Sequence, residues 1–352
     1  MFRDIARFLE QATVDKIRLG RTELMVGRVG FGCLPIQRIR FEEAERLLRR
    51  AVDGGVTFFD TARGYTDSEE KLGRALAGVR DEVIIATKLS GRDRKTLSDQ
   101  LDASLEKLRT DHVDVLQLHN PPGVADPEDP DSAYAAARAA KEQGKARFVG
   151  ITNHRLDVAL AAAQSGLFDA VQFPLSAISH ANDLHLIDVC RAGDLGVIAM
   201  KALCGGLITH VPAAFAFLRQ FGSLVPIWGI QREEELDQFL MLEADPPPLD
   251  DAMRAAIDRD RRELAGDYCR GCGYCLPCPA DIPIPVAARM KFLLRRSPSE
   301  RWLTDEWQEK MARIENCQDC GVCHDRCPYG LHPPDILNKM YEDYRAFLAE
   351  WR

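Results

Sequence analysis

The most constraining feature of this 352-residue sequence is a regular alternation of strand-like and helix-like segments from about residue 26 to residue 240. Short apolar runs rich in β-branched residues predict strands at residues 26–32, 56–61, 82–89, 113–120, 147–153, 169–175, 196–203 and 224–230. Amphipathic segments between them predict helices at residues 42–53, 69–77, 95–108, 133–143, 156–164, 182–191, 212–221 and 233–242. Eight such pairs predict an α/β fold, a closed (β/α)8 TIM barrel. The alternative is an open, doubly wound sheet, which usually carries a glycine-rich turn after its first strand, and no strand here is followed by one.

Charge and hydropathy narrow the class of protein further. The net charge of −8 and the lack of a basic stripe argue against a nucleic-acid partner. No apolar run reaches the roughly 18 residues that a membrane span requires. Residues 1–10 carry charges throughout and lack the apolar core of a signal peptide. We therefore expect a cytoplasmic protein without a membrane partner.

The composition changes after residue 242. Residues 243–251 contain three consecutive prolines among acidic residues, which is typical of a semi-rigid linker, and residues 252–264 predict one more helix. Further helical patterns follow at residues 286–295, 304–314 and 336–351. The sequence therefore predicts a barrel over residues 1–242, a linker and helix over 243–265, and a small α-helical domain over 266–352.

Eight of the 11 cysteines crowd into this last part, in two runs. They are Cys269, Cys272, Cys275 and Cys278 in the first run, and Cys317, Cys320, Cys323 and Cys327 in the second. The second run, followed by Pro328, has the spacing of bacterial ferredoxins, in which three cysteines hold one cluster and the fourth reaches the other. This predicts two [4Fe–4S] clusters in a ferredoxin-like domain. Cys269, Cys272, Cys275 and Cys327 would hold one cluster, and Cys317, Cys320, Cys323 and Cys278 the other.

Both the grouping of the cysteines and the identity of the metal have alternatives. Only two residues separate Cys275 from Cys278, so the first run departs from the ferredoxin spacing. Structural zinc is the alternative metal, because paired Cys-x2-Cys motifs also form zinc ribbons.

Titratable side chains stand at the ends of three successive predicted strands. Asp60, Lys88 and His119 end these strands, and Tyr65 follows in the loop after the first of them. In parallel barrels, such positions carry catalytic groups. Lys88 would lower the pKa of Tyr65, Asp60 would pair with Lys88, and His119 would orient a substrate oxygen, which suits proton transfer to a carbonyl. The alternative is a structural ion pair at a barrel rim.

Residues 17–240 resemble the aldo/keto reductase family. The resemblance rests on motifs at residues 16–20, 29–32, 59–65, 86–88, 118–119 and 150–153. It implies a catalytic tetrad of Asp60, Tyr65, Lys88 and His119, with the tyrosine as general acid/base. It also implies a nicotinamide dinucleotide, NAD(P)H, bound without a Rossmann fold, and a place in the branch of the family with a C-terminal [4Fe–4S] dicluster domain.

The same resemblance implies the residues that would contact the dinucleotide. They are Gly32, Asp60, Thr152, Asn153, Gln172, Met200, Lys201, Leu203, Gly229 and Arg232. The chain departs from the family pattern at Met200, where an aromatic commonly stacks on the nicotinamide. It departs again at Gln231, where a cation often binds a 2′-phosphate, and at Phe239, where an asparagine often contacts adenine. Three glutamates after Arg232 repel phosphate, and the choice between NAD and NADP stays open.

Three functions remain. The first is an oxidoreductase that interconverts a carbonyl and an alcohol in a small molecule, with clusters that exchange single electrons with a carrier such as a ferredoxin. In the second, the barrel chemistry is kept and the clusters are only structural. The third is an electron-transfer or scaffold protein whose barrel no longer binds nicotinamide. Because nicotinamide transfers electron pairs and a cluster transfers single electrons, direct exchange is awkward without an intermediary such as a flavin.

Overall fold

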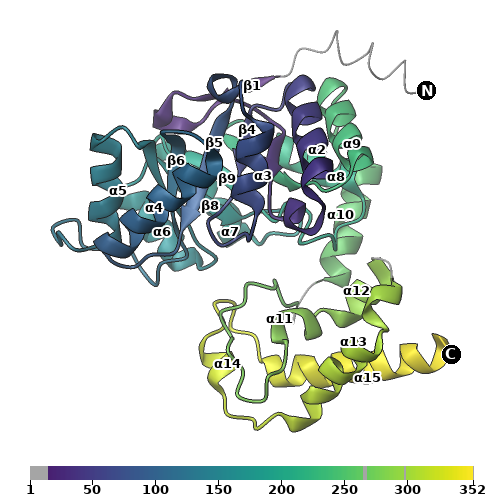
Figure 1. The fold of residues 1–352 in the computed structure, drawn as a ribbon. Coiled ribbons are helices and arrows are strands. Elements are labelled where there is room, and N and C mark those ends of the chain that lie inside the picture. The colour runs from purple at the N-terminus through teal and green to yellow at the C-terminus, as the bar shows by residue number, and fades with distance from the viewer. Residues whose placement is uncertain (1–14, 265–267, 297–298, 352) are drawn as a thin grey trace. The chain divides into compact units, whose positions relative to one another are not determined.

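A computed structural model describes residues 15–264, 268–296 and 299–351 of the chain. Eight parallel strands form a closed barrel, with neighbouring strands in chain order and the last strand paired to the first. The fold predicted for the first part of the chain is confirmed. Figure 1 shows the helices around this barrel. The strands are β3 (Gly30–Gly32), β4 (Phe58–Asp60), β5 (Ile84–Leu89), β6 (Val113–His119), β7 (Ala146–Thr152), β8 (Ala170–Pro174), β9 (Gly196–Met200) and β10 (Leu224–Gly229).

The helices that follow these strands begin and end close to the predicted positions. They are α2 (Phe41–Asp53), α3 (Ser68–Ala75), α4 (Arg94–Leu108), α5 (Ala133–Glu142), α6 (Leu156–Gln164), α7 (Ala181–Ala192), α8 (Val211–Arg219) and α9 (Glu233–Ala244). In α2 the buried residues are Ala44, Leu47, Leu48 and Ala51, the spacing that turns one face of a helix toward a core. The α4 helix begins where the side chain of Asp93 accepts a hydrogen bond from the backbone of Thr96, an N-cap that fixes its start.

The strand predicted over residues 26–32 is wrong as a single element. The structure divides it into β2 (Met25–Gly27), which pairs antiparallel with β1 (Lys16–Arg18), and the first barrel strand β3. The apolar run continues across the break because residues of both strands are buried. Hydrophobic pattern alone therefore does not tell which sheet each half joins.

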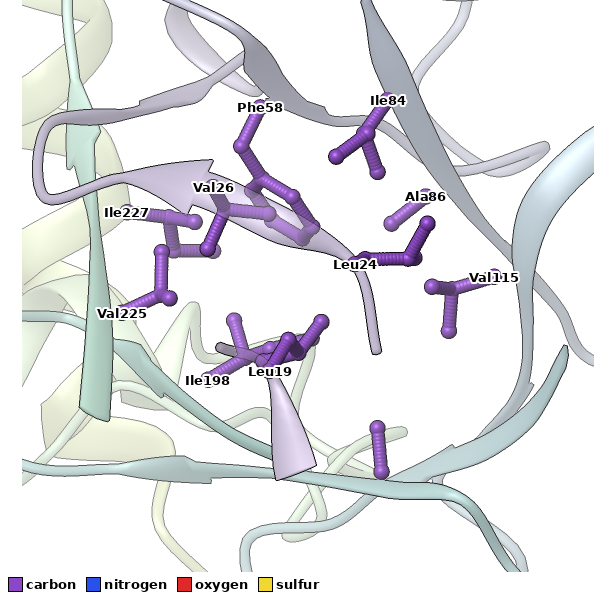
Figure 2. Close-up of a cluster of buried hydrophobic side chains, with 11 residues drawn as sticks. Leu19, Leu24, Val26, Phe58, Ile84, Ala86, Val115, Ile198, Val225 and Ile227 are labelled. Atoms are coloured by element: carbon purple, nitrogen blue, oxygen red, sulfur yellow. The ribbon is translucent and has the colours of Figure 1, made fainter. Parts of the chain in front are cut away.

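This N-terminal hairpin and the turn before β2 fill one end of the barrel. Leu19, Leu24 and Val26 form a buried cluster with side chains from the barrel strands, among them Phe58 at the start of β4 and Ile84 at the start of β5 (Figure 2). These contacts lie where the barrel strands begin. The ends at which the strands finish therefore stay available for polar groups.

A buried carboxylate on β6 ties three strands together, and its loss should destabilise the barrel. Asp114, 1% exposed, accepts hydrogen bonds from Arg80 at 2.9 Å, from Arg147 at 2.7 Å and from the backbone of Ile85 at 2.9 Å. Replacing Asp114 with alanine leaves these donors without their acceptor, which is expected to lower the free energy of unfolding by about 3 kcal/mol.

Urea denaturation under anaerobic conditions measures this loss. Asp102→Ala is the matched control, because Asp102 pairs with Lys145 at the surface, where an ion pair contributes little. Equal stabilities of the two variants would contradict the structural role assigned to Asp114.

The chain's contacts divide it into two units. The first contains the residues up to Ala202 and those from Pro212 to Met253, and the second contains Leu203–Val211 and the residues from Arg254 onward. The helices of the second unit are α10 (Asp251–Glu263, which begins within the first unit), α11 (Ile284–Ala287), α12 (Met290–Arg296), α13 (Asp305–Ala312), α14 (Val322–Asp325) and α15 (Pro333–Trp351). The helix predicted over residues 286–295 is wrong as one helix, because it is interrupted between α11 and α12.

Some predictions concern residues that the structure does not describe. The prediction that residues 1–10 are no signal peptide falls outside the described residues, and so does the predicted domain junction at residues 265–266. The three-domain division stays a prediction. Among the described helices, none is long and apolar enough to cross a membrane.

Candidate active site and cysteine-lined cavities

The barrel brings the predicted catalytic residues to one end. In the parallel register, Asp60 at the end of β4 lies opposite Gly32 at the end of β3. Lys88 lies opposite Gln117, and His119 at the end of β6 lies opposite Thr152 at the end of β7. Strands that run parallel in register carry their last residues to the same rim. The tetrad therefore gathers at the ends where the strands finish.

Lys88 and Asp60 form an ion pair in the barrel interior. The Nζ of Lys88 lies 2.6 Å from Oδ1 of Asp60 and 2.5 Å from the backbone oxygen of Thr61. The two side chains are 1% and 2% exposed. The amide of Gln117 donates to the other oxygen of Asp60 at 3.1 Å. The carboxylate is thereby oriented from two sides, so that the lysine is fixed in position.

The sequence analysis did not single out Gln117. It stands two residues before His119 on β6, so its side chain shares a face of the strand with the histidine. Gln117 could have been predicted from the sequence, because it is a polar residue in an apolar strand, two positions from a candidate catalytic residue.

Tyr65 lies beside this ion pair. Its loop is held by a hydrogen bond from its own backbone nitrogen to the oxygen of Ala62 and by one from the nitrogen of Ser68 to its oxygen. The ammonium of Lys88 is 4.9 Å from the centre of the Tyr65 ring, and the ring of His119 meets it edge-on at 6.3 Å. The structure thus brings all four tetrad residues together.

The expected effect of Lys88 on Tyr65 is opposed by burial. Burial raises the pKa of Tyr65 above its ordinary value, and the charge and hydrogen bond of Lys88 lower it by less. Burial lowers the pKa of Lys88, but Asp60 and Tyr65 more than offset this, so that the pKa of Lys88 is raised. The lysine therefore stays charged and the phenol stays protonated. Lys88 therefore lowers the pKa of Tyr65 as predicted, but the effect of burial is larger.

His119 is a neutral group at this site. Burial, together with the charges of Lys88 and Arg92, lowers the pKa of His119 to about 4. Arg92 donates hydrogen bonds to the backbone oxygens of His119 and Asn120 at 3.0 and 2.8 Å, which holds the end of β6 in place. A neutral imidazole can accept or donate a hydrogen bond to a substrate oxygen.

The three residues predicted to contact the nicotinamide carboxamide differ in their hydrogen-bond partners. The amide of Gln172 is buried, and its hydrogen bond to the carboxylate of Asp60 partly offsets the rise that burial causes in the pKa of Asp60. Thr152 is buried, and its hydroxyl points to the sulfur of Met200 at 3.9 Å. The amide of Asn153 is engaged with backbone atoms of Pro121 and Arg155. Gln172 therefore lies against the buried ion pair, whereas Asn153 holds a loop.

The other residues predicted to contact the dinucleotide lie at or after the ends of the barrel strands. Met200, the last residue of β9, is half-buried against the barrel core, and Lys201 follows in a left-handed conformation with φ of 57°. Gly32 and Gly229 end neighbouring strands in register. Leu203 belongs to the loop that groups with the second unit.

Arg232 does not present an unpaired cation. Its guanidinium forms an ion pair with Glu235 at 2.7 Å. The other oxygen of Glu235 accepts from the backbone nitrogens of Gln231 at 2.9 Å and Arg232 at 3.2 Å. A carboxylate of the chain itself thus caps the start of α9, the kind of position that binds phosphate in many barrels.

Phe239 packs in the core rather than at the surface. It is 2% exposed and stacks on Trp228 with 4.5 Å between ring centres. Its presence in place of a polar residue is explained by this aromatic packing.

The first cysteine cavity lies in the second unit. It is lined by Cys269, Cys272, Cys275 and Cys327. Arg270, within the first cysteine run, lies over the ring of Tyr329 at 4.1 Å, and this contact joins the first run to the end of the second.

The second cysteine cavity is lined by Cys278, Cys317, Cys320 and Cys323, with Cys275 also on its wall. Among the described residues, no three His, Cys, Asp or Glu side chains converge as the ligands of a single metal ion do. The cysteines instead line two cavities. The lining of each cavity includes the four cysteines predicted to bind one cluster. Thiolates around a cavity suit a four-iron cube with its metals at the corners.

The barrel carries a tyrosine, a lysine and a carboxylate at its rim, and the second unit has two cavities lined by four or more cysteines. Together these features are typical of barrel oxidoreductases that carry an iron–sulfur domain. Comparison with known families makes this specific. Residues 23–213 match the aldo/keto reductase family, and residues 268–332 match the 4Fe-4S dicluster domain. The chain belongs to the aldo/keto reductase family, and both parts of the predicted resemblance are confirmed.

Two curated relatives are similar to about half of this chain. L-galactose dehydrogenase of Arabidopsis thaliana is 31% identical over 212 residues, which cover 54% of this chain and 66% of that protein. L-glyceraldehyde 3-phosphate reductase of Escherichia coli is 31% identical over 195 residues, 48% of this chain and 55% of that protein. The chain thus spans less than two thirds of the length of these relatives.

Solved structures show the same fold. An aldo-keto reductase from Klebsiella pneumoniae in complex with NADPH superposes with a TM-score of 0.60 at 21% identity, covering 70% of this chain and 95% of that one. An aldo-keto reductase from Bacillus halodurans gives a TM-score of 0.61 at 20% identity, covering 70% and 96%.

Proposed function

We propose that the chain is a nicotinamide-dependent oxidoreductase that interconverts a carbonyl and an alcohol in a small molecule. The observation that carries the proposal is the buried ion pair of Lys88 and Asp60 beside Tyr65 and His119. Burying such a pair costs desolvation energy, so its presence at the ends of the strands favours a role beyond stability. Here it holds a cation against a phenol at the end of the barrel where substrates bind.

The tetrad moves one proton. In the direction of reduction, the Tyr65 hydroxyl donates its proton to the substrate oxygen, and Lys88 stabilises the phenolate that remains. His119, which is neutral, orients that oxygen. Asp60 keeps the lysine charged and in place.

The residues of the rim fit a nicotinamide ring. Its carboxamide has one donor and one acceptor group, and the buried amide of Gln172, next to Asp60, offers a hydrogen-bonding group to it. Thr152, Met200 and Asp60 would line the ring, and Gly32, Gly229, Lys201, Leu203, Asn153 and Arg232 the rest of the dinucleotide. When bound, the cofactor supplies or accepts a hydride at the substrate carbon.

The pH dependence should differ between the two directions of reaction. Because burial raises the pKa of Tyr65, the proton-donating form dominates throughout the neutral range. Carbonyl reduction is therefore expected to keep a constant rate between about pH 6 and 9, whereas alcohol oxidation, which needs the phenolate, rises with pH. Steady-state rates in both directions measure this. A fall in reduction between about pH 6 and 8 would contradict the assignment of the proton donor.

The clusters are proposed to exchange single electrons with a carrier, such as a ferredoxin. Two clusters in one chain accept two electrons in sequence, the number that one hydride would deliver through an intermediary such as a flavin. Cys269, Cys272, Cys275 and Cys327 would bind one cluster, and Cys278, Cys317, Cys320 and Cys323 the other, and the two cavities support these sets.

A second candidate function follows from α9. Because Glu235 caps the helix and neutralises Arg232, phosphate binding at this end is weakened. The barrel would then bind no dinucleotide and act as a scaffold for the dicluster domain.

Anaerobic assays separate the candidates. Protein with both clusters is mixed with NADH or NADPH and a panel of aldehydes and ketones, and the loss of reduced nicotinamide is followed. Turnover supports the reductase, and the absence of both turnover and dinucleotide binding supports the scaffold. Turnover that survives the loss of both clusters assigns them a structural role.

A further inference from the structure

An arginine in the second unit is fixed at the interruption between α11 and α12. The backbone nitrogen of Arg289 donates to the oxygen of Val286 at 2.9 Å, and its side-chain Nε donates to the oxygen of Pro285 at 2.9 Å. The guanidinium is therefore held by the end of α11 rather than being free to rotate into solvent. The side chain is half-buried.

This guanidinium lies against the first cysteine run. A Cβ added to Gly271 would lie 2.9 Å from Cζ of Arg289, and Gly271 has a φ of 64°, in the region that favours glycine. Gly271 stands between Cys269 and Cys272, which line the first cavity. Arg289 therefore lies against the backbone between two cysteines of that cavity.

The guanidinium of Arg289 also lies close to a second glycine, Gly205. A Cβ on Gly205, whose φ is 70°, would lie 3.0 Å from Nη1 of Arg289. Tyr268, next to Cys269, donates to the backbone oxygen of Cys204 at 3.2 Å. Arg289 is thus enclosed by two backbone loops that leave it little freedom to move.

The charge of Arg289 is not neutralised by a carboxylate within the part of the chain that the structure describes. Other cations nearby are engaged differently. Arg295, on α12, forms a two-pronged pair with Asp343 at 2.6 and 2.9 Å. Arg270 lies over the ring of Tyr329. Among the described residues, Arg289 therefore adds beside the first cavity a fixed positive charge that no carboxylate opposes.

We propose that Arg289 sets the reduction potential of the cluster in the first cavity. The inference rests on the proposed assignment of Cys269, Cys272, Cys275 and Cys327 to that cluster. Reduction adds one electron from a donor and makes the cluster more negative by one charge, with no bond broken and no proton required. A fixed cation favours the more negative form, and net charge is one of the terms that set such potentials.

The test is an anaerobic redox titration of the purified chain with dithionite and mediator dyes, followed by electron paramagnetic resonance. In Arg289→Met, one of the two cluster signals is expected to shift to lower potential. At a fixed potential the ratio of reduced to oxidised cluster would fall about tenfold, and the second signal would stay unchanged. Arg289→Lys, which keeps the charge, should stay close to the unmodified protein. Arg295→Met is the matched control, because its charge is already paired, and it should shift neither signal.

Three results would overturn the proposal. Arg289→Met could titrate like the unmodified protein, or shift both signals equally. Alternatively, Arg289→Met and Arg289→Lys could both lose about four iron atoms, which would make the residue structural. Failure of the underlying assignment is recognised separately, because the unmodified protein would then contain zinc or fewer than two clusters.

Discussion

Replacing Tyr65 with phenylalanine is expected to lower the rate of carbonyl reduction by about 100- to 10,000-fold, the usual contribution of a positioned proton donor. The change removes one oxygen and leaves the ring that lies against Lys88 and His119. Dinucleotide affinity should therefore stay unchanged, and the loss should fall on kcat. The measurement is steady-state kinetics with the best carbonyl substrate of the panel.

Tyr134→Phe is the matched control. Its hydroxyl donates to the backbone oxygen of Leu167 on the outer helical layer, so that its loss removes a buried phenol outside the site. It should keep full activity at a slightly reduced stability. If Tyr65→Phe and Tyr134→Phe were equally active, Tyr65 would not be the proton donor.

Two double substitutions should distinguish the crossed from the uncrossed cluster assignment. Cys269 and Cys327 line the same cavity, so replacing both with alanine removes ligands from one cluster only. About four of the eight expected iron atoms should remain. Cys317 lines the other cavity, so replacing Cys317 and Cys327 together should remove both clusters.

Iron analysis and the visible spectrum of anaerobically purified protein measure these contents. Cys190→Ala is the control, because Cys190 is buried in α7 of the barrel and should leave the iron content unchanged. The reverse pattern, with both clusters lost in the Cys269 and Cys327 variant and one kept in the Cys317 and Cys327 variant, would contradict the crossed assignment.

The sequence predicted the barrel because its pattern is strong and local. Buried strands rich in β-branched residues and helices with one apolar face recur eight times, and parallel pairing then places Asp60, Lys88 and His119 at one rim. The hairpin of β1 and β2 was missed, since Val26 is as apolar as a barrel strand residue although it packs inside the end of the barrel.

Electrostatic features depended on tertiary structure and could not be derived from sequence. The pKa of Tyr65 is decided by how deeply its hydroxyl is buried, which no spacing reveals. The pairing of Arg232 with Glu235 depends on the cap of α9, whereas the sequence shows only a cation followed by acids. Arg289 lies far along the chain from Gly205, and only the fold places them together.

The central claim is that one chain joins a nicotinamide site in the barrel to two iron–sulfur clusters. The most direct test is an anaerobic titration with NADH and with NADPH, in which the absorbance of the reduced nicotinamide and that of the clusters are followed together. The account predicts that one of the two dinucleotides binds and that, with a flavin added as the intermediary, it is oxidised while the cluster absorbance falls by two electrons for each molecule consumed. A chain that contains both clusters but neither binds nor oxidises either dinucleotide would contradict it.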